Sequence, residues 1–140
     1  LIILGEGEEK KKLEKMIHQK KLSEKIFLVG HVNNVYSYMK NSDVFVLSSL
    51  WEEVGFVIVE AAMNNLFVIS SDCSNGPKEF LENGKNGLLY ENNCPNKLTE
   101  SFQIFSNIKN LGEKKLKAKI NSIKYTKFRH HLILKKILSQ

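Results

Sequence analysis

The chain has 140 residues, of which 42% are hydrophobic and 26% are charged, a composition that fits one globular domain with a substantial core. No apolar run approaches the length of a membrane span, and none has the form of a signal peptide. Cys73 and Cys94 lack the spacing of a zinc site. Two cysteines make no disulfide framework either, so we expect reduced thiols in an intracellular protein.

The net charge of +6 is unevenly distributed along the chain. Residues 1–108 hold 11 Lys and Arg against 14 Asp and Glu, whereas residues 109–140 hold ten Lys and Arg against Glu113 alone. We therefore expect an α/β domain in residues 1–108 and a basic helical segment in residues 109–140. The basic segment is interpreted as a solvated helix, and the alternative is attraction to an anionic membrane surface. Nucleic acid is disfavoured, because the segment lacks the glycine and aromatic interleaving of single-strand binders.

Short apolar runs alternate with amphipathic ones from the first residue onward. The apolar runs predict β-strands at residues 1–4, 26–29, 44–47, 67–70 and 87–90. All but the last are rich in continuous apolar residues, which is typical of strands buried on both faces of a parallel sheet. Helices are predicted near residues 8–21, 35–40, 56–64, 77–82 and 95–107. The fold class is therefore α/β, a Rossmann-like parallel sheet flanked by helices. We expect residues 1–4 to be a core strand whose preceding sequence is missing.

The segment from residue 112 to residue 140 has a different pattern. Leu116, Ile120 and Ile123 follow helical spacing and are expected to be buried, while the lysines face solvent or a membrane. Residues 125–128 interrupt the apolar pattern. The segment is therefore predicted to form two helices, or one helix with a bend.

Ligands in doubly wound sheets bind outside the carboxyl ends of the strands, so the loops there are the first places to look. Gly5-Glu6-Gly7 is interpreted as a tight strand-to-helix turn. In the next loop, residues 30–34, Asn33 or Asn34 suits a helix cap. This loop, with His31, is interpreted as a possible contact for a nucleotide base and not as a catalytic element. No Ser–His–Asp or Cys–His arrangement is apparent.

The loop at residues 71–79 allows two interpretations. Gly76 and Pro77 mark a turn and a helix start, with Pro at its preferred first position and Lys78 facing solvent. Alternatively, this small polar loop admits a sugar or phosphate group, with Asn75 and Gly76 lining it and Lys78 supplying a cation.

Glu52 and Glu60 flank a glycine and an apolar run that predicts the start of a helix. A strand end, a glycine turn and a helix start place free backbone N–H groups where a phosphate can dock. Glu60 is the only charged residue between Phe56 and Met63, and a charge in an apolar helix needs a partner. A carboxylate accepts two hydrogen bonds at once, which suits the neighbouring hydroxyls of ribose or a hexose. The arrangement indicates a site for a nucleotide-activated sugar.

Glu52 and Glu60 form an E-x7-E motif within E-E-V-G-F-V-I-V-E-A. The chain also contains L-I-I-L-G-E-G-E-E, F-L-V-G-H-V-N-N, S-D-V-F-V-L-S-S and N-G-L-L-Y, in that order. Together these segments resemble the C-terminal, donor-binding half of retaining GT-B glycosyltransferases, the bacterial family four class also called glycosyl transferases group 1. The resemblance covers residues 1–108, and the basic segment is similar to the closing helices of this family.

The resemblance implies a role for each residue of the motif. Glu60 would bind the ribose hydroxyls, and Glu52 would bind hydroxyls of the donor sugar. Gly55, Phe56 and Val57 would direct backbone N–H groups at the diphosphate and the sugar, and Val32 would lie against the base. Transfer would retain the anomeric configuration with neither a cofactor nor an obligatory metal ion. The catalytic residues on the acceptor side stay unknown.

Two departures from the family pattern matter. Glu53 stands where the family usually has glycine, and the Arg and Lys that neutralise the diphosphate in the family would lie upstream of Leu1. The chain is therefore expected to be part of a longer enzyme and inactive alone.

The loop S-D-C-S-N-G-P-K-E-F is similar to that of enzymes building bacterial surface polysaccharides, lipopolysaccharide or lipid-linked glycans. This implies a UDP-hexose or UDP-N-acetylhexosamine donor, a glycan or lipid-linked acceptor, and a cytoplasmic place, peripheral at the membrane. The alternatives are a non-catalytic nucleotide-binding or interaction module and a GT-B-like isomerase or phosphorylase.

Overall fold

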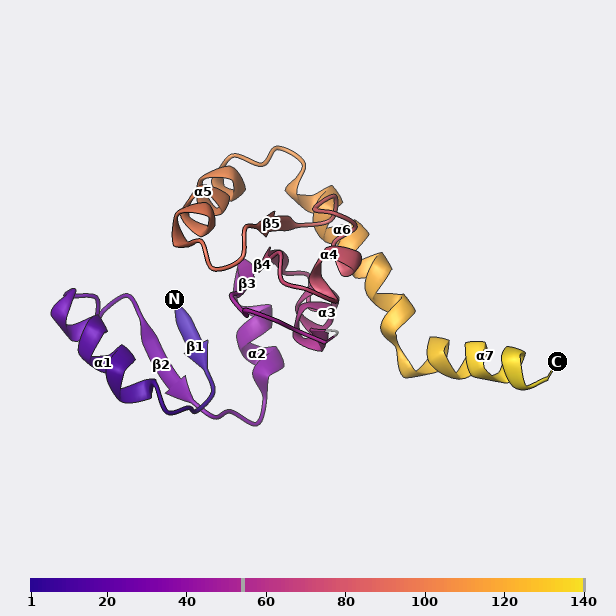
Figure 1. The fold of residues 1–140 in the computed structure, drawn as a ribbon, viewed down its shortest axis with the longest axis horizontal. Coiled ribbons are helices and arrows are strands. Elements are labelled where there is room, and N and C mark those ends of the chain that lie inside the picture. Colours follow the sequence, from indigo (N-terminus) through magenta and orange to yellow (C-terminus); the bar gives the residue numbers. More distant parts are fainter. Residues whose placement is uncertain (54, 140) are drawn as a thin grey trace. The chain divides into compact units, whose positions relative to one another are not determined.

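The computed structural model describes residues 1–53 and 55–139, and the chain falls into two compact units, Leu1–Tyr38 and Met39–Gln140. The boundary between the units lies within helix α2 (Val35–Lys40), and each unit contains one parallel β-sheet (Figure 1). The predicted α/β class is confirmed, with the strands divided between two sheets. The division into residues 1–108 and 109–140 stays a prediction.

The first unit is a strand–helix–strand segment formed by β1 (Ile2–Leu4), α1 (Lys10–Gln19) and β2 (Phe27–Gly30). β1 and β2 pair in parallel, as is usual for two strands joined through a helix. The prediction that residues 1–4 form a strand is confirmed, but the prediction that this strand is buried is wrong. Ile2 and Ile3 are exposed, and α1 has no buried residue. A sheet of two strands with one helix encloses too little volume to cover both of its faces.

The second unit is built on β3 (Val44–Leu47), β4 (Phe67–Ser71) and β5 (Leu88–Tyr90), which lie in that order and are all parallel. The helices α3 (Phe56–Met63) and α4 (Pro77–Phe80) connect these strands, and α5 (Pro95–Ser106) follows them. Every residue of the central strand β4 is buried, as the apolar run Phe67–Ile69 predicts for its first three residues, and Ser70 and Ser71 are buried with them.

The two faces of this sheet are covered by different helices, as Figure 1 shows. On one face Phe67, Ile69 and Tyr90 form a core with Leu98 and Phe105 of α5. α3 and α6 (Leu111–Ser122) pack against β4 as well as against each other. These layers bury β4 on both sides.

Gly87 precedes β5 at a point where only glycine fits. A Cβ atom built there would lie 2.6 Å from the backbone carbonyl oxygen of Val68 on β4. Any side chain would therefore separate the two neighbouring strands.

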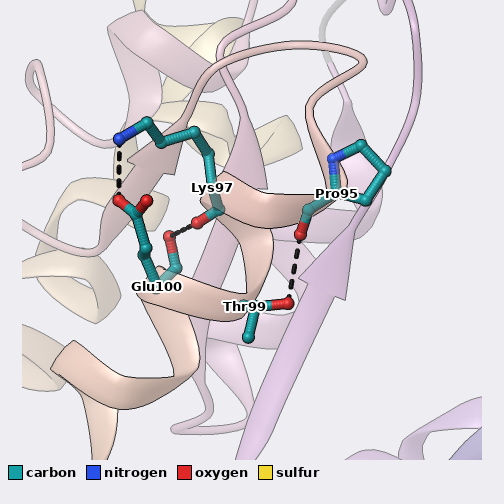
Figure 2. Close-up of polar contacts among 5 residues, drawn as sticks. Pro95, Lys97, Thr99 and Glu100 are labelled. Carbon is teal, nitrogen blue, oxygen red and sulfur yellow. Dashed lines mark hydrogen bonds and ion pairs between the residues drawn. The ribbon is translucent and has the colours of Figure 1, made fainter.

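Local polar contacts stabilise the first turns of α5 (Figure 2). The Lys97 ammonium donates to Glu100 Oε2 at 2.8 Å, and the Thr99 hydroxyl donates to the Pro95 carbonyl at 3.2 Å. The hydrogen bond with Glu100, and the charge of Glu100, raise the pKa of Lys97. Because both groups are exposed, the ion pair contributes little to stability.

The C-terminal segment forms α6, a short 3-10 turn η1 (Ile123–Tyr125) and α7 (Lys127–Leu138), as the two-helix prediction requires. Thr126 caps α7, since its side chain accepts from the Arg129 backbone N–H at 3.3 Å. None of the helices in residues 1–53 and 55–139 combines the length and apolarity needed to cross a bilayer.

The predicted burial of Leu116, Ile120 and Ile123 is wrong. These side chains are 56%, 57% and 59% exposed, whereas Ala118, Asn121 and Ser122 are buried. The buried face carries small residues because α6 packs closely against α3. It also carries Asn121, whose side-chain amide donates to the Phe80 carbonyl at 2.6 Å. The close packing of α6 against α3 and the hydrogen bond from Asn121 to the Phe80 carbonyl therefore explain why this face of α6 is buried.

Candidate functional site

Glu60 lies on α3 among buried apolar neighbours and is itself half-buried. In the described part of the chain, no hydrogen bond or ion pair reaches its carboxylate. Burial removes solvating water from a charged group, so a half-buried carboxylate gains from a hydrogen-bond donor at its covered side. The Glu60 carboxylate is therefore available to a ligand.

Glu52 lies in the loop between β3 and α3, also half-buried, and its carboxylate has a protein partner. The Ser49 hydroxyl donates to Glu52 Oε1 at 2.6 Å. No such contact in the described residues involves Oε2. One carboxylate oxygen is thus held by the protein while the other is left for a ligand. The extra acid Glu53 is exposed.

Gly55 begins α3 in the left-handed conformation, with φ +64° and ψ +49°, and it is buried. A Cβ atom there would meet nothing closer than 3.8 Å, so the backbone angle rather than space requires glycine. Phe56, which is exposed, and the half-buried Val57 are the first helical residues. Their backbone N–H groups have no partner within a helix that starts here, which favours an anion at this end.

Three side chains from later in the sequence hold the loop that carries Glu52. The Tyr90 hydroxyl donates to the Leu47 carbonyl at 3.3 Å, the Ser71 hydroxyl to the Ser49 carbonyl at 2.6 Å, and the Asn92 amide to the Leu50 carbonyl at 2.7 Å. Sequence reasoning missed these residues, because each donor lies 22 to 43 positions beyond its acceptor. The sequence did offer one general signal, because residues at the carboxyl ends of neighbouring parallel strands lie along the same edge of the sheet.

The loop after β4 starts at this same edge, since the Asp72 backbone N–H donates to the Tyr90 carbonyl at 2.7 Å. Asn75 and Gly76 both have positive φ, of 63° and 79°. Lys78 pairs with Asp72 at 3.3 Å rather than standing alone as a cation. A role of Asn75, Gly76 and Lys78 in donor binding stays a prediction.

The remaining sequence expectations fall elsewhere in the chain. Val32 is half-buried and His31 exposed, and contact of either with a base stays a prediction. Asn34 caps α2, as expected, by accepting from the Ser37 backbone N–H at 3.3 Å. Cys73 and Cys94 are free cysteines. In residues 1–53 and 55–139, no three His, Cys, Asp or Glu side chains gather as metal ligands.

Comparison with known proteins identifies the family of this chain and the fold that it shares with solved structures. The family model of glycosyl transferases group 1 matches residues 1–125. An uncharacterized glycosyltransferase of Methanocaldococcus jannaschii is 46% identical over 81 residues, which are 58% of this chain and 20% of that protein. The poly(ribitol-phosphate) alpha-N-acetylglucosaminyltransferase of Staphylococcus aureus is 33% identical over 138 residues, which are 98% of this chain and 28% of that protein.

Other relatives are named for lipopolysaccharide core biosynthesis and for amylovoran biosynthesis. Among solved structures, a variant of S. aureus TarM in complex with fondaparinux, alpha-GlcNAc-glycerol and UDP superposes with a TM-score of 0.84 at 32% identity, over 99% of this chain and 28% of that one. The chain thus spans only 20% and 28% of the length of the M. jannaschii and S. aureus relatives. It belongs to the glycosyl transferases group 1 family, and its fold is that of the Rossmann-like, C-terminal half of a GT-B glycosyltransferase.

Proposed function

We propose that this chain is the donor-binding half of a glycosyltransferase that takes its sugar from a nucleoside diphosphate. In this proposal Glu60 accepts hydrogen bonds from the ribose hydroxyls and Glu52 binds a hydroxyl of the donor sugar. The backbone N–H groups at Gly55, Phe56 and Val57 face the diphosphate, and Val32 lies against the base. The observation that carries the proposal is the half-buried Glu60 carboxylate, which has no partner among the described residues.

The N-terminal end of α3 supports the same assignment. Its unpaired N–H groups and its helix dipole both favour a negatively charged group such as a diphosphate. Glu52 and Glu60 lie on opposite sides of this helix start in the sequence. Because Ser49 already occupies Oε1 of Glu52, the second oxygen, Oε2, suits one directed hydrogen bond from a neutral sugar hydroxyl rather than contact with another anion.

For the donor we propose a UDP-hexose or a UDP-N-acetylhexosamine, and for the acceptor a glycan or a lipid-linked glycan of a bacterial surface polysaccharide. The name of the S. aureus relative, an alpha-N-acetylglucosaminyltransferase acting on poly(ribitol-phosphate), supports this class. The UDP in the TarM complex supports the choice of nucleotide. The family resemblance implies retention of configuration and no obligatory metal ion or cofactor, and both belong to the proposal.

We further propose that this chain acts within a longer enzyme and is inactive alone, because it spans only part of its relatives. The partner domain would supply the acceptor site and the cations for the diphosphate. The enzyme would work in the cytoplasm, peripheral at the membrane, where the basic α6–α7 segment meets anionic lipid.

The test is Glu60→Gln in the full-length enzyme. The amide keeps the shape of the side chain, so folding should be preserved, but it loses the charge-assisted pair of hydrogen bonds to a diol. Loss of one hydrogen bond to a charged group is worth about 1.5–3 kcal/mol, a roughly ten- to hundredfold drop in kcat/KM for UDP-sugar. Kinetics over a panel of UDP-sugars would measure it.

Two further variants serve as controls in the same assay. Glu52→Gln should lower sugar transfer more than it lowers the affinity for free UDP, because its proposed ligand is the sugar. Glu53→Gln should be nearly silent, since this side chain is exposed. A Glu60→Gln enzyme working at the parent rate beside an inactive Glu53→Gln enzyme would show that the motif is assigned in the wrong register.

A further inference from the structure

The backbone of residues 47–50, at the end of β3 and the start of the loop that carries Glu52, is held independently of the Glu52 side chain. The carbonyl groups of Leu47, Ser49 and Leu50 accept hydrogen bonds from Tyr90, Ser71 and Asn92, which come from the ends of β5 and β4 and from the turn after β5. Ser71 is fully buried and its hydrogen bond to the Ser49 carbonyl is part-buried, which limits competition from water. The position of the Ser49 backbone therefore does not depend on the Ser49 hydroxyl.

The Ser49 hydroxyl makes a separate contact, with the carboxylate of Glu52. The Oγ–Oε1 distance of 2.6 Å is that of a short, charge-assisted hydrogen bond. An ionised carboxylate only accepts hydrogen bonds, so the hydroxyl must donate. This contact fixes the rotation of the carboxylate and directs Oε2 away from Ser49. Without it, a side chain with three rotatable bonds would sample several orientations.

We propose that Ser49 is a positioning residue for Glu52. It holds Oε1 so that Oε2 is presented to a hydroxyl of the donor sugar, while Ser71 and Asn92 hold the loop in which both residues lie. This proposal rests on the proposed function of Glu52 as the sugar-binding acid. It assigns to Ser49 an effect on the sugar and none on the nucleotide, because Ser49 acts only through Glu52.

The experiment uses the full-length enzyme and five variants: Ser49→Ala, Ser49→Thr, Glu52→Gln, the double variant Ser49→Ala/Glu52→Gln, and the control Ser48→Ala. Ser48 is the exposed neighbouring serine and lies outside the site. Three quantities are measured, namely kcat/KM for the release of UDP from UDP-N-acetylglucosamine and from UDP-glucose, the Kd of free UDP, and the melting temperature.

For Ser49→Ala we expect a loss of roughly tenfold in kcat/KM, the lower end of the effect of one hydrogen bond to a charged group. The Kd of UDP and the melting temperature should stay near the parent values, since the backbone of the loop is held elsewhere. Ser49→Thr keeps a hydroxyl and should restore most of the loss, and Ser48→Ala should match the parent. In the double variant, Ser49→Ala should add little to the loss caused by Glu52→Gln, because there is no longer a carboxylate to position.

A full additive loss in the double variant would overturn the proposal, because Ser49 would then act without Glu52. Equal losses in UDP affinity, melting temperature and turnover would also overturn it, by showing a general role in folding. An unchanged Ser49→Ala enzyme, alongside a weakened Glu52→Gln enzyme, would overturn the role of Ser49 alone. A parent enzyme that neither binds UDP nor consumes either donor would instead contradict the proposed function, and the role of Ser49 would fail with it.

Discussion

Tyr90 joins two strand ends through its phenol hydroxyl, which donates to the Leu47 carbonyl next to the loop that carries Glu52. Burial of the phenol raises its pKa, and the neighbouring Cys73 adds to this effect. The neutral form is the one that donates, so the raised pKa keeps the phenol in the protonated form that makes this contact. Tyr90 thus links the pH dependence of stability to the loop of the candidate site.

The raised pKa of Tyr90 predicts a loss of stability at alkaline pH. Below the ordinary pKa of 10.0 the phenol is neutral in both folded and unfolded chains, and its contribution is complete. Above it the unfolded chain releases the proton first, so the free energy of unfolding falls as pH rises through the folded pKa. Tyr90→Phe should cost about 1 kcal/mol near neutral pH through the lost hydrogen bond.

The measurement is the free energy of unfolding of the parent and of Tyr90→Phe from about pH 8 to about pH 11. The difference between the two proteins should shrink above pH 10.0. Since the lysines and Tyr125 are common to both proteins, their titration cancels in the comparison. A difference that stays constant over this range would contradict the assignment.

At the scale of elements, α6 fixes the second unit by its small and polar face. Asn121 satisfies the Phe80 carbonyl at the end of α4, and the Lys114 ammonium donates to the Lys85 carbonyl at 2.7 Å. The apolar residues Leu116 and Ile120 face away and are exposed. α6 therefore stabilises the fold by close packing and by capping carbonyls rather than by burying its largest side chains.

This arrangement predicts a large loss of stability for one substitution on α6 and almost none for another. Ala118→Leu should cost about 1–3 kcal/mol, because it overpacks a residue that is 1% exposed. Ile120→Gln should change stability by no more than about 0.5 kcal/mol, because its side chain already lies in solvent. Urea unfolding of both variants measures this. A larger loss for Ile120→Gln would mean that α6 buries the opposite face.

At the scale of the whole molecule, the positive charge is concentrated in residues 109–140, while residues 1–108 hold more acids than bases. Every residue of α7 is exposed, and these residues include the apolar Phe128 and Leu138 as well as Lys135 and Lys136. Exposed lysines next to exposed apolar residues suit the interface of an anionic membrane. This is the feature on which the proposed peripheral location depends.

The full-length protein should bind vesicles containing phosphatidylserine, and binding should weaken as salt rises, because exposed charges are screened. Replacing Lys135 and Lys136 by glutamine should weaken binding roughly tenfold or more at low salt, at about 1 kcal/mol for each lysine. The matched control replaces Lys11 and Lys15 on α1. Vesicle sedimentation measures each variant, and equal binding to neutral and anionic vesicles would leave only a solvated helix.

The sequence by itself determined the strand and helix order, the turn at Gly55 and the pair of acids at Glu52 and Glu60. Apolar periodicity and backbone restrictions are local properties, so they can be read within a window of a few residues. The apolar run Phe67–Ile69 also predicted the burial of these residues of β4 correctly, because a central parallel strand has no face in solvent.

Only the tertiary structure decided which faces are buried and which side chains hold the candidate site. Ile2 and Ile3 of β1 stay exposed because a two-stranded sheet with one helix cannot cover both faces. α6 buries Ala118 rather than Ile120 because a neighbouring helix comes close. The hydrogen bonds from Ser71 and Asn92 to the loop of Glu52 span 22 and 42 positions. Such contacts form only when parallel strands place their carboxyl ends at one edge of the sheet. A sequence pattern of a few residues contains no information about which distant residues meet there.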